Sequence, residues 1–182
     1  MIPLFRRSPK PTIAALYGAI VAQARLPRFY EDYQVPDTVL GRFDMVLLHV
    51  VLLLRRLRQG EARDRALAQQ LFDTFCRDMD HNLREMGISD QGVPIQMRRV
   101  GEAFYGRAQA YEAALAEAGD DALREALTRN VYAGAPVDAA ALGALSAYVR
   151  QTEHELAGQT LDALAAGAVR FGEPARRTAA AE

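Results

Sequence analysis

Three side chains between positions 78 and 81 are of the types that bind metal ions. Asp78, Asp80 and His81 lie close together in the sequence. In a helix, however, positions 78 and 80 point to different faces, so the two carboxylates are poorly placed to chelate one ion. Asp80 instead precedes Arg84 by four residues, the favourable order for an ion pair along a helix. We therefore predict a solvated charged face here and no metal site.

The usual signatures of catalysis are missing from the sequence. It contains no glycine-rich loop that would cradle a phosphate, no convincing nucleophile–base set and no second acidic motif for prenyl-diphosphate chemistry. Because Cys76 is the only cysteine, an internal disulfide and a cysteine-based metal cluster are excluded, and a reducing compartment fits. Cys76 itself is interpreted as a small buried hydrophobic residue. We expect no catalytic residue, no metal and no cofactor.

Two polar residues lie in the most apolar segment of the chain, residues 39–57. His49 is the one residue between positions 45 and 54 that is not apolar. We interpret it as a core histidine with one hydrogen-bonded nitrogen, and the alternative is a ligand or acid–base group. Asp44 either caps the helix or forms a buried ion pair that fixes neighbouring helices, since a buried carboxylate must be paired. The residues given structural polar roles are Asp44, His49, Asp80 and Arg84.

Clusters of arginine mark the candidate partner-binding surface. One cluster follows the apolar segment, where cations also suit the negative end of the helix dipole. Another opens a later helix, where the dipole does not explain it. A patch that mixes arginine with tyrosine and methionine is typical of protein interfaces. The predicted partner-binding residues are Arg55, Arg56, Arg58, Arg98, Arg99, Tyr105 and Arg107.

Two glycines in the second arginine region also point to a contact. Gly101 and Gly106 lie inside an expected helix, where each costs about 1 kcal/mol relative to alanine. Such a cost indicates that another backbone approaches closely. The approaching backbone is either a packed neighbouring helix of this chain or a segment of a client protein.

The rest of the sequence is organised as helices that would position these groups. Apolar residues recur at steps of three and four, which indicates amphipathic helices, and strand signals are nearly absent. The expected helical segments are residues 13–24, 27–33, 39–57, 62–86, 93–115, 123–131 and 138–164. The expected caps are Thr12, Asp37 or Thr38, Asp120 or Asp121, Asp138, and Gly87 at a C-terminus. The predicted fold class is all-α, with about six to seven helices.

Length and composition indicate one compact helical domain. The chain has 182 residues, of which 50% are hydrophobic and 25% charged, and its formal net charge is −1. This composition argues against intrinsic disorder, and the near-neutral charge argues against specific or general binding of nucleic acid. The apolar run at positions 45–54 is far shorter than the roughly 20 residues needed to cross a bilayer. We therefore predict no transmembrane segment.

The expected domain boundaries follow changes in composition. Residues 1–11 are expected to form a flexible arm, or alternatively a weak membrane-surface anchor in which the first apolar side chains insert beside Arg6 and Arg7. Residues 12–171 are expected to form the helical domain. Its alanine-rich part, residues 113–171, is expected to pack peripherally because alanine buries little area. Residues 172–182 are expected to be a disordered tail.

Six segments of the chain together resemble the ubiquinol–cytochrome c reductase assembly chaperones. They are LYGAIVAQAR (16–25), PRFY (27–30), VPDTVLGRFDMVLLH (35–49), LRRLR (54–58), LFDTFCRDMDHNLREMGISD (71–90) and EAFYGR (102–107). They occur in the family's order between about residues 14 and 111. The chain is most similar to a bacterial form, because mitochondrial members carry a long targeting region before the matching part. The region after Leu115 resembles nothing known in the family.

The resemblance implies an all-helical protein that is not an enzyme. Members of the family escort newly made cytochrome b into the respiratory cytochrome bc complex, and the mitochondrial ones also associate with the ribosome and a small partner. Cytochrome b, or another hydrophobic membrane protein, is therefore the implied client. A bacterial form is expected in the cytoplasm, with peripheral contact to the cytoplasmic face of the inner membrane.

Two other hypotheses stand beside this one. A small helical lipid or quinone carrier, or an enzyme, would need an enclosed pocket of about 300–1,000 Å³ with several converging polar groups. A structural subunit would need neither a pocket nor a client. A chaperone instead predicts an exposed apolar groove, lined by aromatic residues and methionine and rimmed by arginines.

Overall fold

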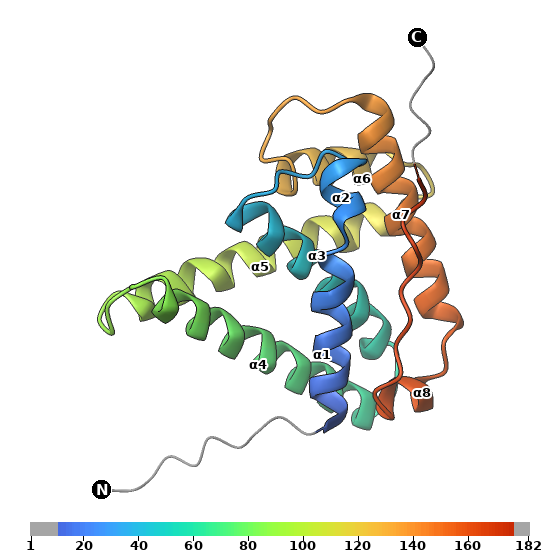
Figure 1. Cartoon of the computed structure of the whole chain (residues 1–182). Coiled ribbons are helices and arrows are strands. Elements are labelled where there is room, and N and C mark those ends of the chain that lie inside the picture. Colours follow the sequence, from blue (N-terminus) through green and yellow to red (C-terminus); the bar gives the residue numbers. More distant parts are fainter. Residues whose placement is uncertain (1–10, 177–182) are drawn as a thin grey trace, which may run out of the picture.

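The computed structural model describes residues 11–176, and this part of the chain consists of helices joined by short loops. Its helices are α1 (Pro11–Ala24), α2 (Pro27–Glu31), α3 (Val39–Arg58), α4 (Ala62–Glu85), α5 (Val93–Ala116), α6 (Asp121–Asn130), α7 (Ala139–Gly158) and α8 (Leu161–Ala165). Figure 1 shows their order along the chain. The predicted all-α fold class is confirmed.

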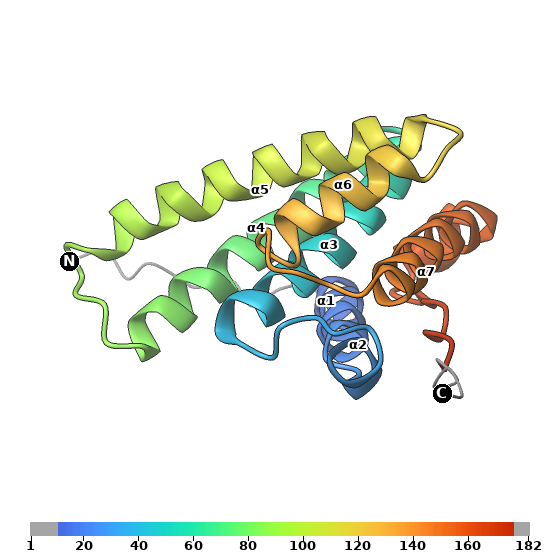
Figure 2. The ribbon, with the colours of Figure 1, turned by 90° about the horizontal axis from the view of Figure 1, so that it is seen from above.

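The helices are arranged around α3. α4 and α5 form a long hairpin whose tip projects to one side of the molecule (Figure 1). α6 runs alongside α5, while α7 packs on another side of α3 (Figure 2). α1 contacts both α3 and α4. α1, the hairpin and α7 therefore surround α3 from different directions.

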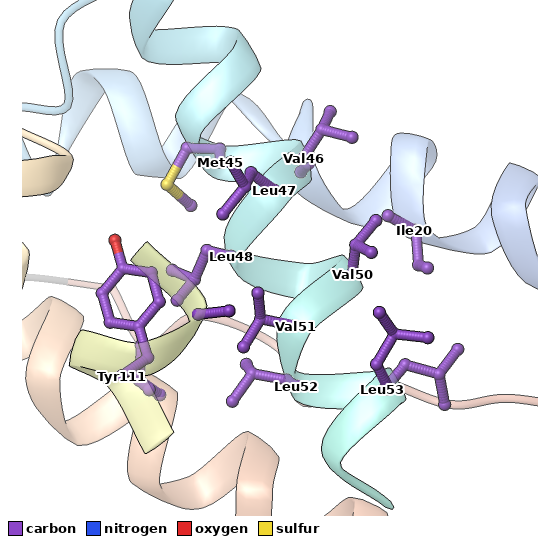
Figure 3. Packing of buried hydrophobic residues seen from close by; sticks show 14 of the residues in the cluster. Ile20, Met45, Val46, Leu47, Leu48, Val50, Val51, Leu52, Leu53 and Tyr111 are labelled. Carbon is purple, nitrogen blue, oxygen red and sulfur yellow. The ribbon is translucent and has the colours of Figure 1, made fainter. Parts of the chain in front are cut away.

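The apolar run of α3 forms the centre of the hydrophobic core. Every residue from Met45 to Leu54 is buried. Figure 3 shows these side chains pointing away from α3 in several directions, with Ile20 of α1 and Tyr111 of α5 packed near them. A helix that is apolar on nearly all sides must be covered by other elements, so the predicted wrapped central helix is confirmed. None of the helices in residues 11–176 is both long and apolar enough to span a membrane.

Local sequence explains where α3 begins and where α4 ends. Thr38 Oγ1 accepts a hydrogen bond from the Gly41 backbone N–H at 3.1 Å, which confirms one of the two predicted caps. Gly41 lies so close to the preceding loop that an added Cβ would be 2.0 Å from the Pro36 carbonyl oxygen. Gly87 follows α4 with a φ of 83°, the left-handed conformation predicted for it.

Two helix boundaries differ from the sequence prediction. Thr12 is not a cap, because α1 already begins at Pro11, whose fixed φ suits the first helical position. The segment expected as one helix at 138–164 is divided into α7 and α8. The division occurs because Thr160 starts a new helix: its Oγ1 accepts a hydrogen bond from the Ala163 backbone N–H at 3.2 Å.

Two aspartates precede helices in the second half of the chain. Asp138 caps α7 as predicted, because its carboxylate accepts a hydrogen bond from the Ala140 backbone N–H at 3.0 Å. Asp120 precedes α6, but its carboxylate accepts from Arg150 Nε at 3.2 Å and makes no cap hydrogen bond. The position of Asp120 in the sequence therefore predicted the start of α6 correctly, but its carboxylate binds Arg150 and does not cap the helix.

The alanine-rich half shares the core of the first half. Leu127 of α6 and Leu145 and Val149 of α7 belong to the same buried cluster as the apolar residues of α3. The sequence predicts a peripheral position for this half, whereas the structure integrates it through these few large side chains. The described residues therefore form one domain with one core.

The chain after α8 continues as an extended segment that packs against α1 and α2. Gln23 Nε2 donates to the Gly172 carbonyl at 2.7 Å, Tyr33 Oη donates to the Ala175 carbonyl at 3.1 Å, and Arg28 donates to the Pro174 carbonyl. The sequence predicts a disordered tail from residue 172, whereas the structure holds 172–176 through these bonds. Residues 177–182 lie outside the described part of the chain, as does the expected N-terminal arm except for Pro11.

Candidate functional site

An open groove lies between α1, α3 and the α4–α5 hairpin, and we call it the hairpin groove. Its volume is about 670 Å³. Its apolar lining consists of Val21, Val39, Leu40, Phe43, Val46, Met79, Leu83, Met86, Val100 and Ala103. Val39, Leu40 and Met86 are 70%, 54% and 62% exposed, respectively. A cluster of large apolar side chains in water is typical of a site that a partner covers.

Two carboxylates line the hairpin groove from α4, and both already have partners. Asp78 accepts a hydrogen bond from the Tyr17 hydroxyl at 2.7 Å. Burial and the bond to Asp78 both raise the pKa of Tyr17, so the phenol stays a hydrogen-bond donor. Glu85 lies 3.1 Å from His81 Nε2, one helical turn earlier. These contacts use part of the hydrogen-bonding capacity of both acids.

Four arginines also line the hairpin groove: Arg25, Arg42, Arg99 and Arg107. Arg42 pairs with Asp37, with Nε and Oδ1 2.6 Å apart. Arg25 and Arg99 are exposed, and neither makes a hydrogen bond or an ion pair with a residue between 11 and 176. The groove therefore presents two guanidinium groups with free donors, one directly after α1 and one on α5.

Arg107 connects the hairpin groove to a buried carboxylate on α3. Its Nε lies 2.9 Å from Asp44 Oδ1, and Asp44 is 1% exposed. The buried ion pair, one of the two interpretations of Asp44, is confirmed. Neither Asp44 oxygen accepts a hydrogen bond of normal geometry from a residue in the described part of the chain. Burial raises the pKa of Asp44 to about 7, although Arg107 acts to lower it.

His49 lies in an aromatic cluster between α3 and α7. Its Nδ1 is 2.7 Å from the Met45 carbonyl oxygen and its Nε2 is 2.7 Å from the Tyr148 hydroxyl. Because a carbonyl can only accept, Nδ1 carries the proton and Nε2 accepts from Tyr148. Burial lowers the pKa of His49 to about 4, so the ring is neutral at pH 7. The core-histidine interpretation is confirmed, but both nitrogens are bonded, because α7 brings Tyr148 to the second one.

The residues first considered for metal chemistry form surface contacts instead. Arg84 Nε lies 2.8 Å from Asp80 Oδ2, and Arg84 also pairs with Asp90. No group of three or more His, Cys, Asp or Glu within residues 11–176 could hold a metal ion. Cys76 is half-buried, and burial raises the pKa of its thiol. The arrangement described so far is suited to binding an apolar surface.

The family model described as ubiquinol-cytochrome C chaperone matches residues 31–171. The chain belongs to this family. Ubiquinol-cytochrome-c reductase complex assembly factor 1 from Xenopus laevis is 28% identical over 151 residues, which are 82% of this chain and 75% of that protein. The family is one of chaperones and assembly factors for the cytochrome bc complex.

A solved bacterial structure has the same fold as this member of the chaperone family. The crystal structure of the Cbp3 homolog from Brucella abortus superposes with a TM-score of 0.81 at 44% sequence identity, and the match covers 89% of each chain. The resemblance inferred from the six sequence segments, including that to a bacterial form, is therefore confirmed. The matched range includes α7 and α8, so the alanine-rich half belongs to the family fold as well.

The structure separates the predicted partner-binding residues of this chaperone-family chain. Arg99 and Arg107 line the hairpin groove. Arg98 and Tyr105 do not line it, although both are exposed on α5. Arg98 Nε is 3.7 Å from Glu102, and Tyr105 is 63% exposed. Their role in binding a partner remains a prediction.

The three arginines at the end of α3 hold helices together. Arg55 Nε lies 3.4 Å from Glu153 Oε1 of α7. Arg56 donates to the carbonyls at the C-terminus of α7, at 3.0 and 2.8 Å. Arg58 Nη1 lies 3.0 Å from Glu112 Oε1 of α5. The predicted role of these three arginines in binding a partner stays a prediction.

Sequence reasoning missed the residues that make the rim of the hairpin groove. Val39 and Leu40 occupy the first turn of α3. They line the groove opposite the α4–α5 hairpin and stay exposed. Met86 is the C-cap residue that follows α4, and the sequence does not indicate that its side chain is exposed. The one available signal was their position at helix ends: Val39 and Leu40 follow a cap, and Met86 is the last apolar residue of its helix stripe.

Proposed function

We propose that this protein is a non-enzymatic assembly chaperone that binds newly made cytochrome b and aids its entry into the respiratory cytochrome bc complex. The observation that carries the proposal is the hairpin groove, an open apolar surface on a chain of the ubiquinol-cytochrome C chaperone family. A hydrophobic client would cover Val39, Leu40 and Met86, which are otherwise exposed to water.

The shape of the hairpin groove favours a protein client over a small molecule. A carrier or enzyme would enclose its ligand and converge several polar groups on it. Here the apolar lining comes from four helices and its rim is open, while the interior histidine is engaged by Met45 and Tyr148. The lipid or quinone carrier and the enzyme therefore have less support than the chaperone.

The proposal also includes the location of the chaperone in the cell and its additional partners. A bacterial member would act from the cytoplasm, in peripheral contact with the inner membrane, while its client is being inserted. A ribosome or a small co-chaperone would be additional partners. No cofactor is part of the proposal.

The proposed function is tested by deleting the gene from a bacterium that carries it and recording haem b by difference spectroscopy of the membranes. We expect the absorbance of the cytochrome bc complex to fall and to return when the gene is restored. Normal haem b absorbance in the deletion strain would overturn the proposal. Copurification of untagged cytochrome b from a lysate tests the client directly, with a strain lacking cytochrome b as control.

A further inference from the structure

Resting on the proposed function, we propose that the hairpin groove binds a single α-helix of the client, and that Arg99 pairs with a carboxylate beside the apolar face of that helix. The occupant is thus an apolar or amphipathic helix that carries an acidic residue. This deepens the proposed function, because it names the part of the client that is held and a residue that selects it.

The form of the hairpin groove fits one helix. Its apolar lining is contributed by α1, α3, α4 and α5, and exposed side chains at Leu40 and Met86 extend it to the surface. A helix that lies in such a groove inserts side chains spaced i, i+3, i+4 and i+7. Met79 and Met86 suit an adaptable lining, because methionine is unbranched and fills irregular gaps.

Free hydrogen-bond donors identify the polar part of the occupant. Arg42 is paired with Asp37 at 2.6 Å, and Arg107 with Asp44 at 2.9 Å. The side chains of Arg25 and Arg99, by contrast, make no hydrogen bond or ion pair with a residue between 11 and 176. A guanidinium group that lies next to an apolar surface is well suited to a carboxylate, because it can donate two parallel hydrogen bonds.

Each acid of the hairpin groove already has a side-chain partner, whereas Arg99 has no such partner among residues 11–176. Asp78 already accepts a hydrogen bond from Tyr17 at 2.7 Å, and Glu85 lies 3.1 Å from His81. An acidic occupant is therefore favoured over a basic one. The N-terminal residues of the same chain, MIPLFRRSPK, contain three basic residues and no acid, so their charge fits the groove poorly.

The test measures binding of the full chain to synthetic helical peptides with leucines at i, i+3, i+4 and i+7 and one variable residue at the edge of the apolar face. The variable residue is Glu, Gln or Lys, and binding is read by fluorescence anisotropy. We expect the Glu peptide to bind about tenfold more tightly than the Gln peptide, the gain typical of a charge-assisted hydrogen bond. The Lys peptide should bind most weakly.

Two variants and one control assign the effect to residues. Arg99→Gln should remove the preference for the Glu peptide, because it removes the free guanidinium. Leu40→Asp should weaken all three peptides, because it places a charge on the apolar rim. Arg58→Gln is the matched control: Arg58 is also exposed, but it pairs with Glu112 and does not line the groove. Circular dichroism checks that each variant is folded.

Several outcomes would overturn the inference. Equal binding of the Glu and Gln peptides, or an Arg99→Gln variant that behaves like Arg58→Gln, would exclude the carboxylate contact. Competition by phospholipid vesicles but not by peptides would show that the groove binds lipid. A stable dimer that Leu40→Asp dissociates would show that a second copy covers the groove. If deletion of the gene abolishes haem b but Arg99→Gln and Leu40→Asp both restore it fully, the proposed function stands and this inference fails.

Discussion

Asp44 and His49 lie in the same helix, α3, and both are at most 1% exposed, yet their surroundings differ. His49 faces α7 and has both ring nitrogens hydrogen-bonded. Asp44 faces α5 and has an ion pair with Arg107, but no hydrogen bond of normal geometry within the described residues. One side of α3 is therefore a closed interior, while the other adjoins a groove whose wall includes Arg107, the partner of Asp44.

The same difference appears in the pKa values. Burial is the main cause of both shifts, and it acts against the charged form of each group. It raises the pKa of Asp44 to about 7 and lowers that of His49 to about 4. Arg107 only partly offsets the burial of Asp44. The ion pair therefore fixes α5 against α3 at a cost that the His49 site does not carry.

Arg107→Leu tests the side of α3 that adjoins the hairpin groove. Removing the cation leaves a protonated Asp44 buried without its polar partner, so we expect the free energy of unfolding at pH 7 to fall by about 1–3 kcal/mol. Urea denaturation followed by circular dichroism measures the change. The double variant Asp44→Leu and Arg107→Leu should lie within about 1 kcal/mol of the wild type, because a buried ion pair is often replaceable by apolar residues. A loss below about 1 kcal/mol in the single variant would contradict the assigned pair.

Tyr148→Phe tests the closed side of α3. The hydroxyl binds His49 Nε2 at 2.7 Å and accepts from Gln23 Nε2 at 3.0 Å. Its removal leaves both groups without this partner, and we expect a loss of about 1–3 kcal/mol. Tyr105→Phe is the control, because Tyr105 is 63% exposed, and it should change stability by less than about 0.5 kcal/mol. A Tyr148→Phe protein as stable as the control would show that the bonds to His49 contribute little.

The two groups should also make opposite contributions to pH dependence. Unfolded Asp and His titrate near pKa values of about 3.9 and 6.5. Folded Asp44 therefore binds its proton more readily than unfolded Asp, and its contribution to stability falls as pH rises from about 4 to about 7. Folded His49 binds its proton less readily, and its contribution rises between about pH 4 and 6.5.

Single variants separate these two opposing slopes, each at most about 1.4 kcal/mol per pH unit. In Asp44→Asn, stability should rise more steeply with pH than in the wild type, because the His49 contribution is no longer opposed. In His49→Gln, it should fall more steeply with pH over the same interval. Urea midpoints measured from pH 4 to pH 7 give both profiles. Parallel profiles in all three proteins would refute the assigned pKa shifts.

Gly101→Ala gives the smallest expected effect and concerns α5. A Cβ on Gly101 or Gly106 would meet no described atom within 4 Å, so the predicted close approach of a neighbouring helix of this chain is wrong. We expect Gly101→Ala to stabilise the protein by about 0.5–1 kcal/mol. Gly41→Ala should destabilise it, because the new Cβ would lie 2.0 Å from the Pro36 carbonyl oxygen.

The same glycine variants bear on the remaining alternative, a client segment that approaches α5. If Gly101→Ala raises the midpoint of thermal unfolding but lowers copurification of cytochrome b, a client lies against that face. If it raises stability and leaves copurification unchanged, the glycine has no partner. A destabilised Gly101→Ala protein would contradict the open surroundings of this residue.

Periodicity and capping residues were sufficient to predict most of the helices. The repeated three- and four-residue steps identified α3, α4 and α5, and Thr38 and Gly87 marked two of their ends correctly. The same logic failed at Thr160, because a short helix after α7 continues the apolar spacing and only the cap hydrogen bond reveals the break. Local patterns thus predict elements well and predict interruptions poorly.

Contacts between distant segments could not be predicted in this way. The sequence required a partner for Asp44 but did not say that it would be Arg107, and it assigned that arginine to partner binding. It also gave no indication that Tyr148 would bind His49 or that Leu40 and Met86 would meet at one groove. Each of these depends on how long helices cross, which side-chain spacing along one helix does not determine.

The extended C-terminal segment has a consequence for the order in which the domain is completed. The ring of Phe171 lies 5.4 Å from that of His49, in a T-shaped arrangement. His49 is synthesised early, whereas Phe171 and the carbonyls that bind Gln23, Arg28 and Tyr33 are among the last parts of the domain to leave the ribosomal exit tunnel. A nascent chain that stops before Phe171 lacks this ring contact and the carbonyls that bind Gln23, Arg28 and Tyr33, so the domain is complete only after Ala175 has been synthesised.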